Sequence, residues 1–253
     1  MIQMINWRMN FRFSCLTFLL LSAAAHAQVT VPVGAAVQLN GGSIDLGGND
    51  LVVGGSLSIG AGAIDAGHGI AIAASGVIDA GTGSLSVSGD WSNAGVFVPG
   101  SSLVTFEDGA EALSNYSGNT RFHDAAFVSA AGKTHAFAVG STQEFDGLLR
   151  ILGTAALPIQ ITSSAAGQVA FFNLLPGGSQ DIHFVGVSDV HAIGQPLAPD
   201  ETNQGGAGND VGWFGNTPLV EAAQIPTLSS FGALLLALAL VALVARRRSQ
   251  FLD

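Results

Sequence analysis

Residues 44–81 read IDLGGNDLVVGGSLSIGAGAIDAGHGIAIAASGVIDAG, and this stretch decides the fold class. Short aliphatic pieces alternate in it with glycine turns, and none of the pieces is long enough for a helix. The form Ile-Asp-x-Gly occurs at residues 44–47, 64–67 and 78–81, at spacings of twenty and fourteen residues. Such spacing suits a solenoid, in which each coil buries its apolar face on the next. We therefore predict an all-β fold, a right-handed parallel β-helix; short strands with glycine turns also fit a β-sandwich, the alternative.

The aspartates of this repeat, Asp45, Asp65 and Asp79, fall at predicted turns, where a carboxylate accepts hydrogen bonds from nearby backbone amides. Coils stacked in register would align them as an acidic row. Polysaccharide lyases and hydrolases built on β-helices use such rows, sometimes with calcium. A lyase also needs Lys or Arg, and after residue 27 none precedes Arg121. We therefore predict a protein that is not an enzyme, with a carbohydrate-binding or polysaccharide-degrading β-helix as the competing hypothesis.

Residues 89–106, GDWSNAGVFVPGSSLVTF, extend the same pattern. They are similar to the phrase G-x-W-x-N-x-G-x-F … V-T-F that recurs in secreted bacterial β-helix and adhesin-like proteins. The interior of the solenoid is expected to hold Trp91, Val96, Phe97, Val104 and Phe106. We expect Asn93 and Gly95 to make the turn between two strands.

After residue 110 phenylalanines become frequent and the strand candidates longer, which predicts wider coils of the same solenoid. Residues 181–214 are expected to form a last strand and an irregular cap. The cap ends in GGAGNDVGWF, residues 205–214, which resembles the close of the same surface proteins; Trp213 and Phe214 suit it to cover the last apolar coil.

Oxygen ligands suited to calcium crowd the glycine-rich loop near the end of this region: Asp200, Glu201, Asn203, Asn209 and Asp210. Their spacing matches neither an EF-hand nor the glycine-aspartate nonapeptide, so turn chemistry is favoured and no metal or cofactor is predicted. The histidines are scattered singly, without ligand spacing, and are expected at the surface or in turns.

The N-terminus reads as a secretory signal peptide. Arg8 and Arg12 precede an apolar run over residues 13–25, and Ala25, His26 and Ala27 form a small-x-small site for signal peptidase. Cleavage before Gln28 is expected; a retained N-terminal anchor is the alternative. Cys15, the only cysteine, lies in the leader, so the mature chain would contain no disulfide.

The region between the two termini is strongly acidic. Residues 28–226 contain seventeen Asp and Glu against three basic residues, Arg121, Lys133 and Arg150, which leaves this region about fourteen units negative. Binding to phosphate backbones needs Lys and Arg to replace counterions, so nucleic-acid binding is excluded.

The C-terminus predicts a membrane anchor. Residues 228–245 are eighteen residues without a charge, and as a helix they would span about 27 Å, close to the hydrocarbon thickness of a bilayer. Arg246, Arg247 and Arg248 follow directly, and such a cluster stays on the cytoplasmic side. The region before the anchor is then expected outside the membrane.

Residues 225–232, IPTLSSFG, followed by this apolar segment and the arginines, resemble the IPTL-CTERM protein-sorting domain, and the resemblance is confined to this end of the chain. The signature lies on Ile225, Pro226, Thr227, Leu228, Phe231 and Gly232, with Phe231 where the family usually carries Trp. The resemblance implies recognition and cleavage by an exosortase, a membrane-embedded transpeptidase of Gram-negative bacteria. A plain tail anchor is the alternative.

The predicted organisation is therefore a signal peptide over residues 1–27, an ectodomain over 28–214, a stalk over 215–226 and a sorting signal over 225–253. The precursor is expected to cross the inner membrane once and the product to reach the cell surface or the extracellular matrix. There it would act as a structural or adhesin-like protein, with extracellular polysaccharide as the expected partner.

Overall fold

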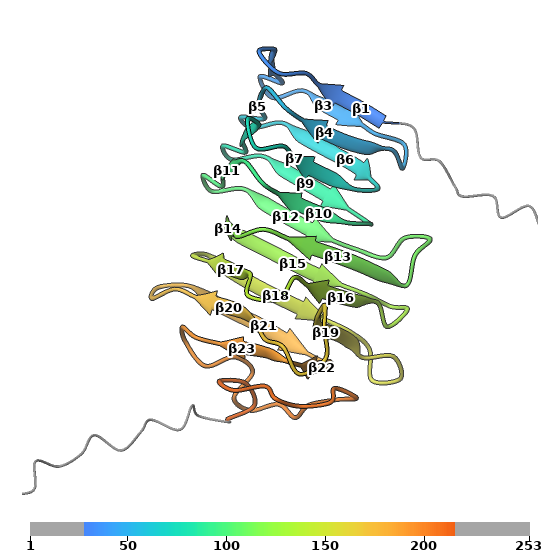
Figure 1. Ribbon diagram of the computed structural model, residues 1–253, viewed down its shortest axis with the longest axis vertical. Helices are drawn as coiled ribbons and strands as arrows, with labels where there is room; N and C mark the ends of the chain where they lie inside the picture. The colour runs from blue at the N-terminus through green and yellow to red at the C-terminus, as the bar shows by residue number, and fades with distance from the viewer. Residues whose placement is uncertain (1–27, 216–253) are drawn as a thin grey trace, which may run out of the picture.

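The polypeptide winds into a stack of coils, and each coil contributes short strands to sheets that run along the stack (Figure 1). The computed structural model describes residues 28–215. In that range every pairing between strands is parallel and no helix occurs. A β-sandwich consists of antiparallel sheets, so that alternative is wrong and the predicted parallel solenoid is confirmed. The direction of its coiling stays a prediction.

The longest sheet, face A, has eight strands, one from each coil, and so the solenoid has about eight turns. In sheet order these are β1 (Gln28–Val31), β4 (Asp50–Val53), β7 (Ile70–Ile72), β10 (Trp91–Asn93), β13 (Leu113–Ser117), β16 (Thr134–Phe137), β19 (Ile159–Ser163) and β22 (Val185–Ser188). The coils differ in length: the shortest runs from Leu51 to its register partner Ile70, and one of the widest runs from Thr134 to Gln160. The widest coils lie after residue 110 and continue the same sheet, as predicted.

Two further sides complete each coil. Face C contains β3 (Ser43–Asp45), β6 (Ala63–Gly67), β9 (Ser84–Val87), β12 (Leu103–Phe106), β15 (Asp124–Val128), β18 (Leu148–Leu152) and β21 (Ser179–His183). The third side is divided into two sheets. Face B contains β2 (Ala36–Gln38), β5 (Ser56–Ser58), β8 (Val77–Asp79) and β11 (Val96–Val98). Face D contains β14 (Thr120–Phe122), β17 (Thr142–Phe145), β20 (Ala170–Leu174) and β23 (Val190–Ala192).

The core is a column of side chains that alternate with outward-facing residues along each strand. Aliphatic residues fill the first coils and aromatic rings fill the later ones. The rings stack from coil to coil: Phe106 lies 4.7 Å from Phe127, and Tyr116 lies 4.5 Å from Phe137. Parallel register places like residues on successive coils directly over one another, so the rings meet face to face.

The stretch over residues 89–106 was predicted correctly in part. Trp91, Phe97, Val104 and Phe106 are buried, as expected, but Val96 is 51% exposed. Val96 begins β11, and the alternation of that strand sends Phe97 inward and its neighbours outward. The prediction for Val96 is therefore wrong.

Asn93 also departs from the prediction, since it ends β10 rather than making the turn. Its amide lies inside the solenoid and donates to the Thr120 hydroxyl at 3.1 Å and to the Asn119 carbonyl at 3.1 Å. Gly95 does lie in the turn, where a side chain would collide with the Ala73 carbonyl oxygen at 2.3 Å. A buried amide that binds the next coil replaces the expected turn residue.

The C-terminal end of the solenoid is closed by residues 193–215, which pass beneath the last coils (Figure 1). Trp213 and Leu197 are fully buried there and form an isolated bridge. The Trp213 ring lies 5.8 Å from Phe172 and covers the end of the aromatic column. Phe214 is partly buried against the same core. The predicted irregular cap is confirmed, but only over residues 193–215. Residues 181–192, expected to hold a single last strand, instead contain the end of β21 and all of β22 and β23, so that part of the prediction is wrong.

Candidate functional site

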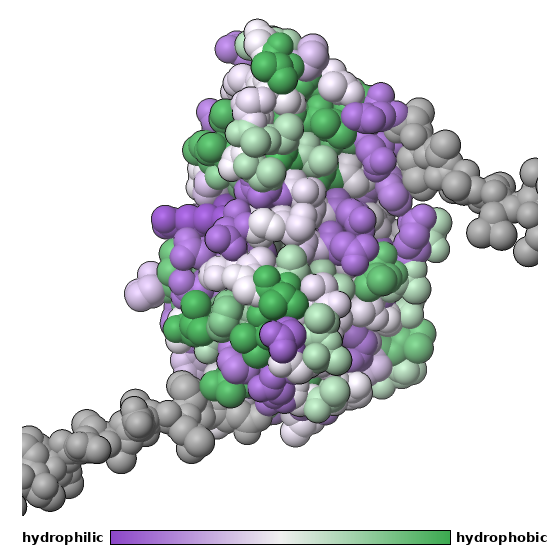
Figure 2. Space-filling model, in the orientation of Figure 1, coloured by the Kyte–Doolittle hydropathy of each residue, from purple (hydrophilic) through white to green (hydrophobic). Residues whose placement is uncertain are grey.

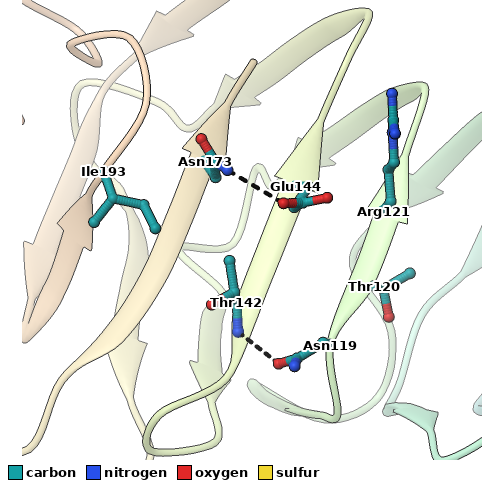
Figure 3. Close-up of a pocket in the computed structure, with 7 residues that line it drawn as sticks. All are labelled: Asn119, Thr120, Arg121, Thr142, Glu144, Asn173 and Ile193. Atoms are coloured by element: carbon teal, nitrogen blue, oxygen red, sulfur yellow. Dashed lines mark hydrogen bonds between the residues drawn. The ribbon is translucent and has the colours of Figure 1, made fainter.

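A groove with a volume of about 540 Å³ runs across face D of the solenoid (Figure 3). It is lined by residues of the three strands β14, β17 and β20 and of two flanking turns: Asn119, Thr120, Arg121, Thr142, Glu144, Asn173 and Ile193. Nearly all of them are polar, and they come from successive coils.

The alternation of the strands positions these residues. Phe122, Phe145 and Phe172 point into the core, so the residues between the inward positions face solvent. Arg121 is the register partner of Glu144, and Glu144 is the register partner of Asn173. Neighbouring strands are about 4.8 Å apart, so the three side chains form a ladder along the solenoid axis.

A second ladder lies beside the first and carries the aromatic surface of face D. Thr142 pairs with Phe171, and Phe171 pairs with His191. Asn119, just before β14, stands at the other end and accepts a hydrogen bond from the Thr142 amide at 2.9 Å. The Phe171 and His191 rings meet edge to face at 6.2 Å and are only partly buried.

Hydrogen bonds within the groove fix its polar groups. Asn173 donates its amide to Glu144 Oε1 at 3.2 Å (Figure 3). Within residues 28–215, Glu144 Oε2 and Asn119 Nδ2 make no hydrogen bond of their own. A carboxylate and an amide held in place in this way can exchange hydrogen bonds with a ligand.

Arg121, which lines the groove, is paired with a carboxylate outside it. Arg121 donates from Nε to Asp146 Oδ2 at 2.8 Å, and Asp146 Oδ1 lies 2.7 Å from His123 Nδ1. Figure 3 shows the Arg121 side chain directed away from Glu144 and Asn173. The groove therefore offers uncharged hydrogen-bonding groups and one carboxylate to a ligand.

The predicted acidic row is not formed. Asp45 and Asp65 are register partners on face C, but Asp79 ends β8 on face B. The step from the second Ile-Asp-x-Gly motif to the third is less than one coil, so the third motif falls on a different side of the solenoid. Asp45 accepts from the Gly47 amide at 2.8 Å and Asp79 from the Gly81 amide at 3.2 Å, as predicted for turn aspartates.

The calcium candidates are divided between two places. Asp210 accepts from the Asn203 amide at 2.7 Å, and the Asn209 amide donates to Asp189 at 2.6 Å. Asp200 and Glu201 lie in a separate surface depression, where Glu201 lies 2.6 Å from His183 Nδ1. The part of the chain that the structure describes contains no cluster of three or more His, Cys, Asp or Glu side chains placed to hold a metal.

The histidines follow the expectation with one exception. His68, His123, His183 and His191 lie at or near the surface beside carboxylates or an amide. His135 is fully buried, so the prediction for it is wrong. Its Nδ1 lies 2.7 Å from the Tyr116 hydroxyl, and its Nε2 has no partner within the described range. Burial, with the nearby charge of Lys133, lowers the pKa of His135 to about 3.

The proposed export and sorting residues lie outside the described residues, except for Gln28, which opens β1. Between residues 28 and 215 no helix is long and apolar enough to cross a membrane.

The groove was missed at the level of sequence because no motif marks it. Its weak signal is the recurrence of an inward phenylalanine next to one outward polar residue at residues 121–122, 144–145 and 172–173. No family model, curated protein or solved structure matches this chain.

Proposed function

We propose that this chain is an exported structural or adhesin-like protein of the cell surface, whose right-handed β-solenoid binds a neutral extracellular polysaccharide along face D. The observation that carries the binding proposal is the ladder of polar side chains from successive coils in the groove. Right-handed coiling is expected because parallel crossovers are almost always right-handed.

The repeat of the groove supports a polymeric ligand. Each coil presents an equivalent pair of outward positions about 4.8 Å beyond the last, so a ligand with a repeating array of hydroxyl groups can meet each coil in turn. Planar amides and a carboxylate bind vicinal hydroxyls, and the partly exposed ring of Phe171, in register with Thr142 of the groove, offers an apolar contact for a sugar ring. The strongly negative surface disfavours an anionic chain.

Binding without cleavage is the form that this geometry supports. Hydrolysis of a glycosidic bond ordinarily uses two carboxyl groups that flank it, and the lining of this groove supplies one, Glu144. Asp45 and Asp65, on face C, have no Lys or Arg among their register partners. We therefore propose an adhesive rather than a catalytic role.

Delivery rests on the two terminal signals of the sequence. Ala25 and Ala27 supply the signal-peptidase site, and Ile225–Leu228 with Arg246–Arg248 supply the sorting signal. The proposed partners are signal peptidase and an exosortase-type transpeptidase, which cleaves near Thr227. The product would then be a rigid rod attached by its C-terminal end.

Loss of the groove side chains should weaken binding strongly. We expect Glu144→Ala combined with Asn173→Ala to weaken retention by a neutral polysaccharide at least tenfold, since two adjacent steps of the ladder disappear. Affinity electrophoresis through gels containing xylan, β-glucan or dextran measures this, with alginate as the anionic comparison.

The matched control is Gln38→Ala combined with Ser58→Ala, a register pair on the outward side of face B. It should leave retention unchanged. Retention by none of the neutral polymers, or equal losses in the two double variants, would refute the binding proposal. New reducing ends in the incubated polymer would instead favour the polysaccharide-cleaving alternative.

A further inference from the structure

The first coil leaves the N-terminal end of the core uncovered. On face A, Val29 is the register partner of Leu51, and Leu51 is the register partner of Ile70, so the three form a row of side chains that point into the core. Leu51 and Ile70 are 3% and 2% exposed. Val29 itself is 41% exposed, because within residues 28–215 no coil lies beyond it. Val37 and Ile44 end the inward rows of the other two sides in the same way and are only partly buried.

The opposite end of the solenoid differs. There the last inward residues, Val185 and Val187, are fully buried beneath the cap that contains Leu197 and Trp213. The N-terminal end presents instead three edge strands, β1, β2 and β3, whose outer backbone groups face no other strand of the described chain. An edge of this kind is a template for pairing with another strand.

The first coil also lacks the features that usually prevent such pairing. Asp45 is the only charged residue among residues 28–48, although the surrounding region is strongly acidic. None of its three strands contains lysine, proline or a bulge. In Figure 2 the upper end of the rod carries mainly green and pale residues, with purple residues at its upper left edge and beside the grey trace.

The chain itself offers little to cover this end once the proposed processing has occurred, and on this point the inference rests on the proposed function. Cleavage before Gln28 makes the first residue of β1 the first residue of the protein. Gly215, the last residue that the structure describes, lies at the opposite end of the rod (Figure 1). The surface that remains to match these three short edge strands, whose one charged side chain is Asp45, is the same surface on a second copy.

We propose that the first coils of two molecules pair end to end, with β1 of one molecule antiparallel to β1 of the other. A two-fold axis through face A then places β2 of each copy beside β3 of its partner, and both strands have three residues. The contact is closed, because the capped ends point outward. Molecules attached by their C-terminal ends would pair at their tips, within one surface or between two cells.

Single-cysteine cross-linking of the full-length chain tests the pairing. The background is Cys15→Ser, which removes the only native cysteine whether or not the leader is cleaved. A short bis-maleimide should link Thr30→Cys molecules into a dimer in most of the protein. Thr162→Cys, the same residue type on face A near the other end, should remain monomeric.

A charge on the uncovered core row should break the pair. We expect Val29→Lys to reduce the Thr30→Cys dimer at least fivefold, whereas Val139→Lys, at a similarly exposed valine (46%), should leave it unchanged. Thermal unfolding of both variants verifies that each is folded.

A Thr30→Cys dimer no more abundant than the Thr162→Cys dimer, or one that Val29→Lys leaves intact, would overturn the inference. Mapping of the N-terminus on the same samples separates the two failures. A monomer that begins at Gln28 overturns the pairing alone, whereas a chain that retains residues 1–27 removes the export premise and the pairing with it.

Discussion

Replacing Trp213 by alanine should lower the free energy of unfolding of residues 28–215 by about 3–5 kcal/mol. Trp213 is fully buried, and its ring closes the aromatic column over Phe172. Removing it leaves a cavity at the end of the core. It also exposes the apolar side of the last coil, which the cap of a solenoid normally covers. Denaturation by guanidinium chloride, followed by circular dichroism, measures the change.

Trp213→Phe is the matched control. It retains most of the ring and removes an indole N–H that is buried without an acceptor in the described part of the chain. A buried donor without a partner costs about 1–3 kcal/mol, and this gain should offset part of the lost contact area. The phenylalanine variant should therefore lie much closer to the native protein than the alanine variant. Equal stability of all three proteins would mean that residues 193–215 do not function as a cap.

Acidification should destabilise the solenoid through His135. Its folded pKa of about 3 lies below the unfolded value of 6.5, because burial opposes the charged imidazole. As the pH falls below 6.5, the unfolded chain takes up a proton that the folded chain does not bind until about pH 3. Stability is therefore lost over this window at about 1.4 kcal/mol per pH unit, or about 3 kcal/mol by pH 4.

The double variant Tyr116→Phe with His135→Phe should remove this acid sensitivity. Replacing both hydrogen-bonded partners by apolar rings leaves neither polar group unpaired, so stability at pH 7 should change little. Tyr116→Phe alone retains the histidine and should retain the pH dependence. Unfolding curves between pH 7 and 4 compare the three proteins; an unchanged slope in the double variant would contradict the assignment to His135.

Asp108 affects stability over a lower pH range than His135, so the two contributions to acid sensitivity can be separated. The pKa of Asp108 is lowered, despite the opposing effect of burial, by hydrogen bonds from Ser129 and the Ala130 and Ala131 amides. Its contribution to stability is lost as the pH falls below about 3.8 through the folded value. Between pH 6.5 and 4, the difference between the native protein and the double variant reports on His135.

The fold class was predictable because the sequence pattern that specifies it repeats within short segments of the chain. Glycine turns between short alternating strands recur about once per side of a coil, and Trp213 stands where an aromatic cap is needed. The register was not predictable, since the coils differ in length and each change of length moves a motif along the coil. Asp79 therefore leaves the row that Asp45 and Asp65 begin, although all three share one motif.

The candidate site depended on that register. Arg121, Glu144 and Asn173 become neighbours only when three coils stack, and no short spacing connects them in the sequence. His135 illustrates the same limit: nothing near it distinguishes a buried histidine from the surface histidines, and its burial follows from the aromatic rings of other coils that surround it.

The most direct test of an exported and sorted surface protein is the mass of the mature product recovered from its native cells, with peptide mapping of both ends. Export and sorting predict a chain that begins at Gln28 and ends near Thr227, without the segment that contains Arg246, Arg247 and Arg248. A product that still carries these arginines would contradict the sorting proposal and identify a plain membrane anchor. A product that still begins at Met1 would contradict cleavage of the leader.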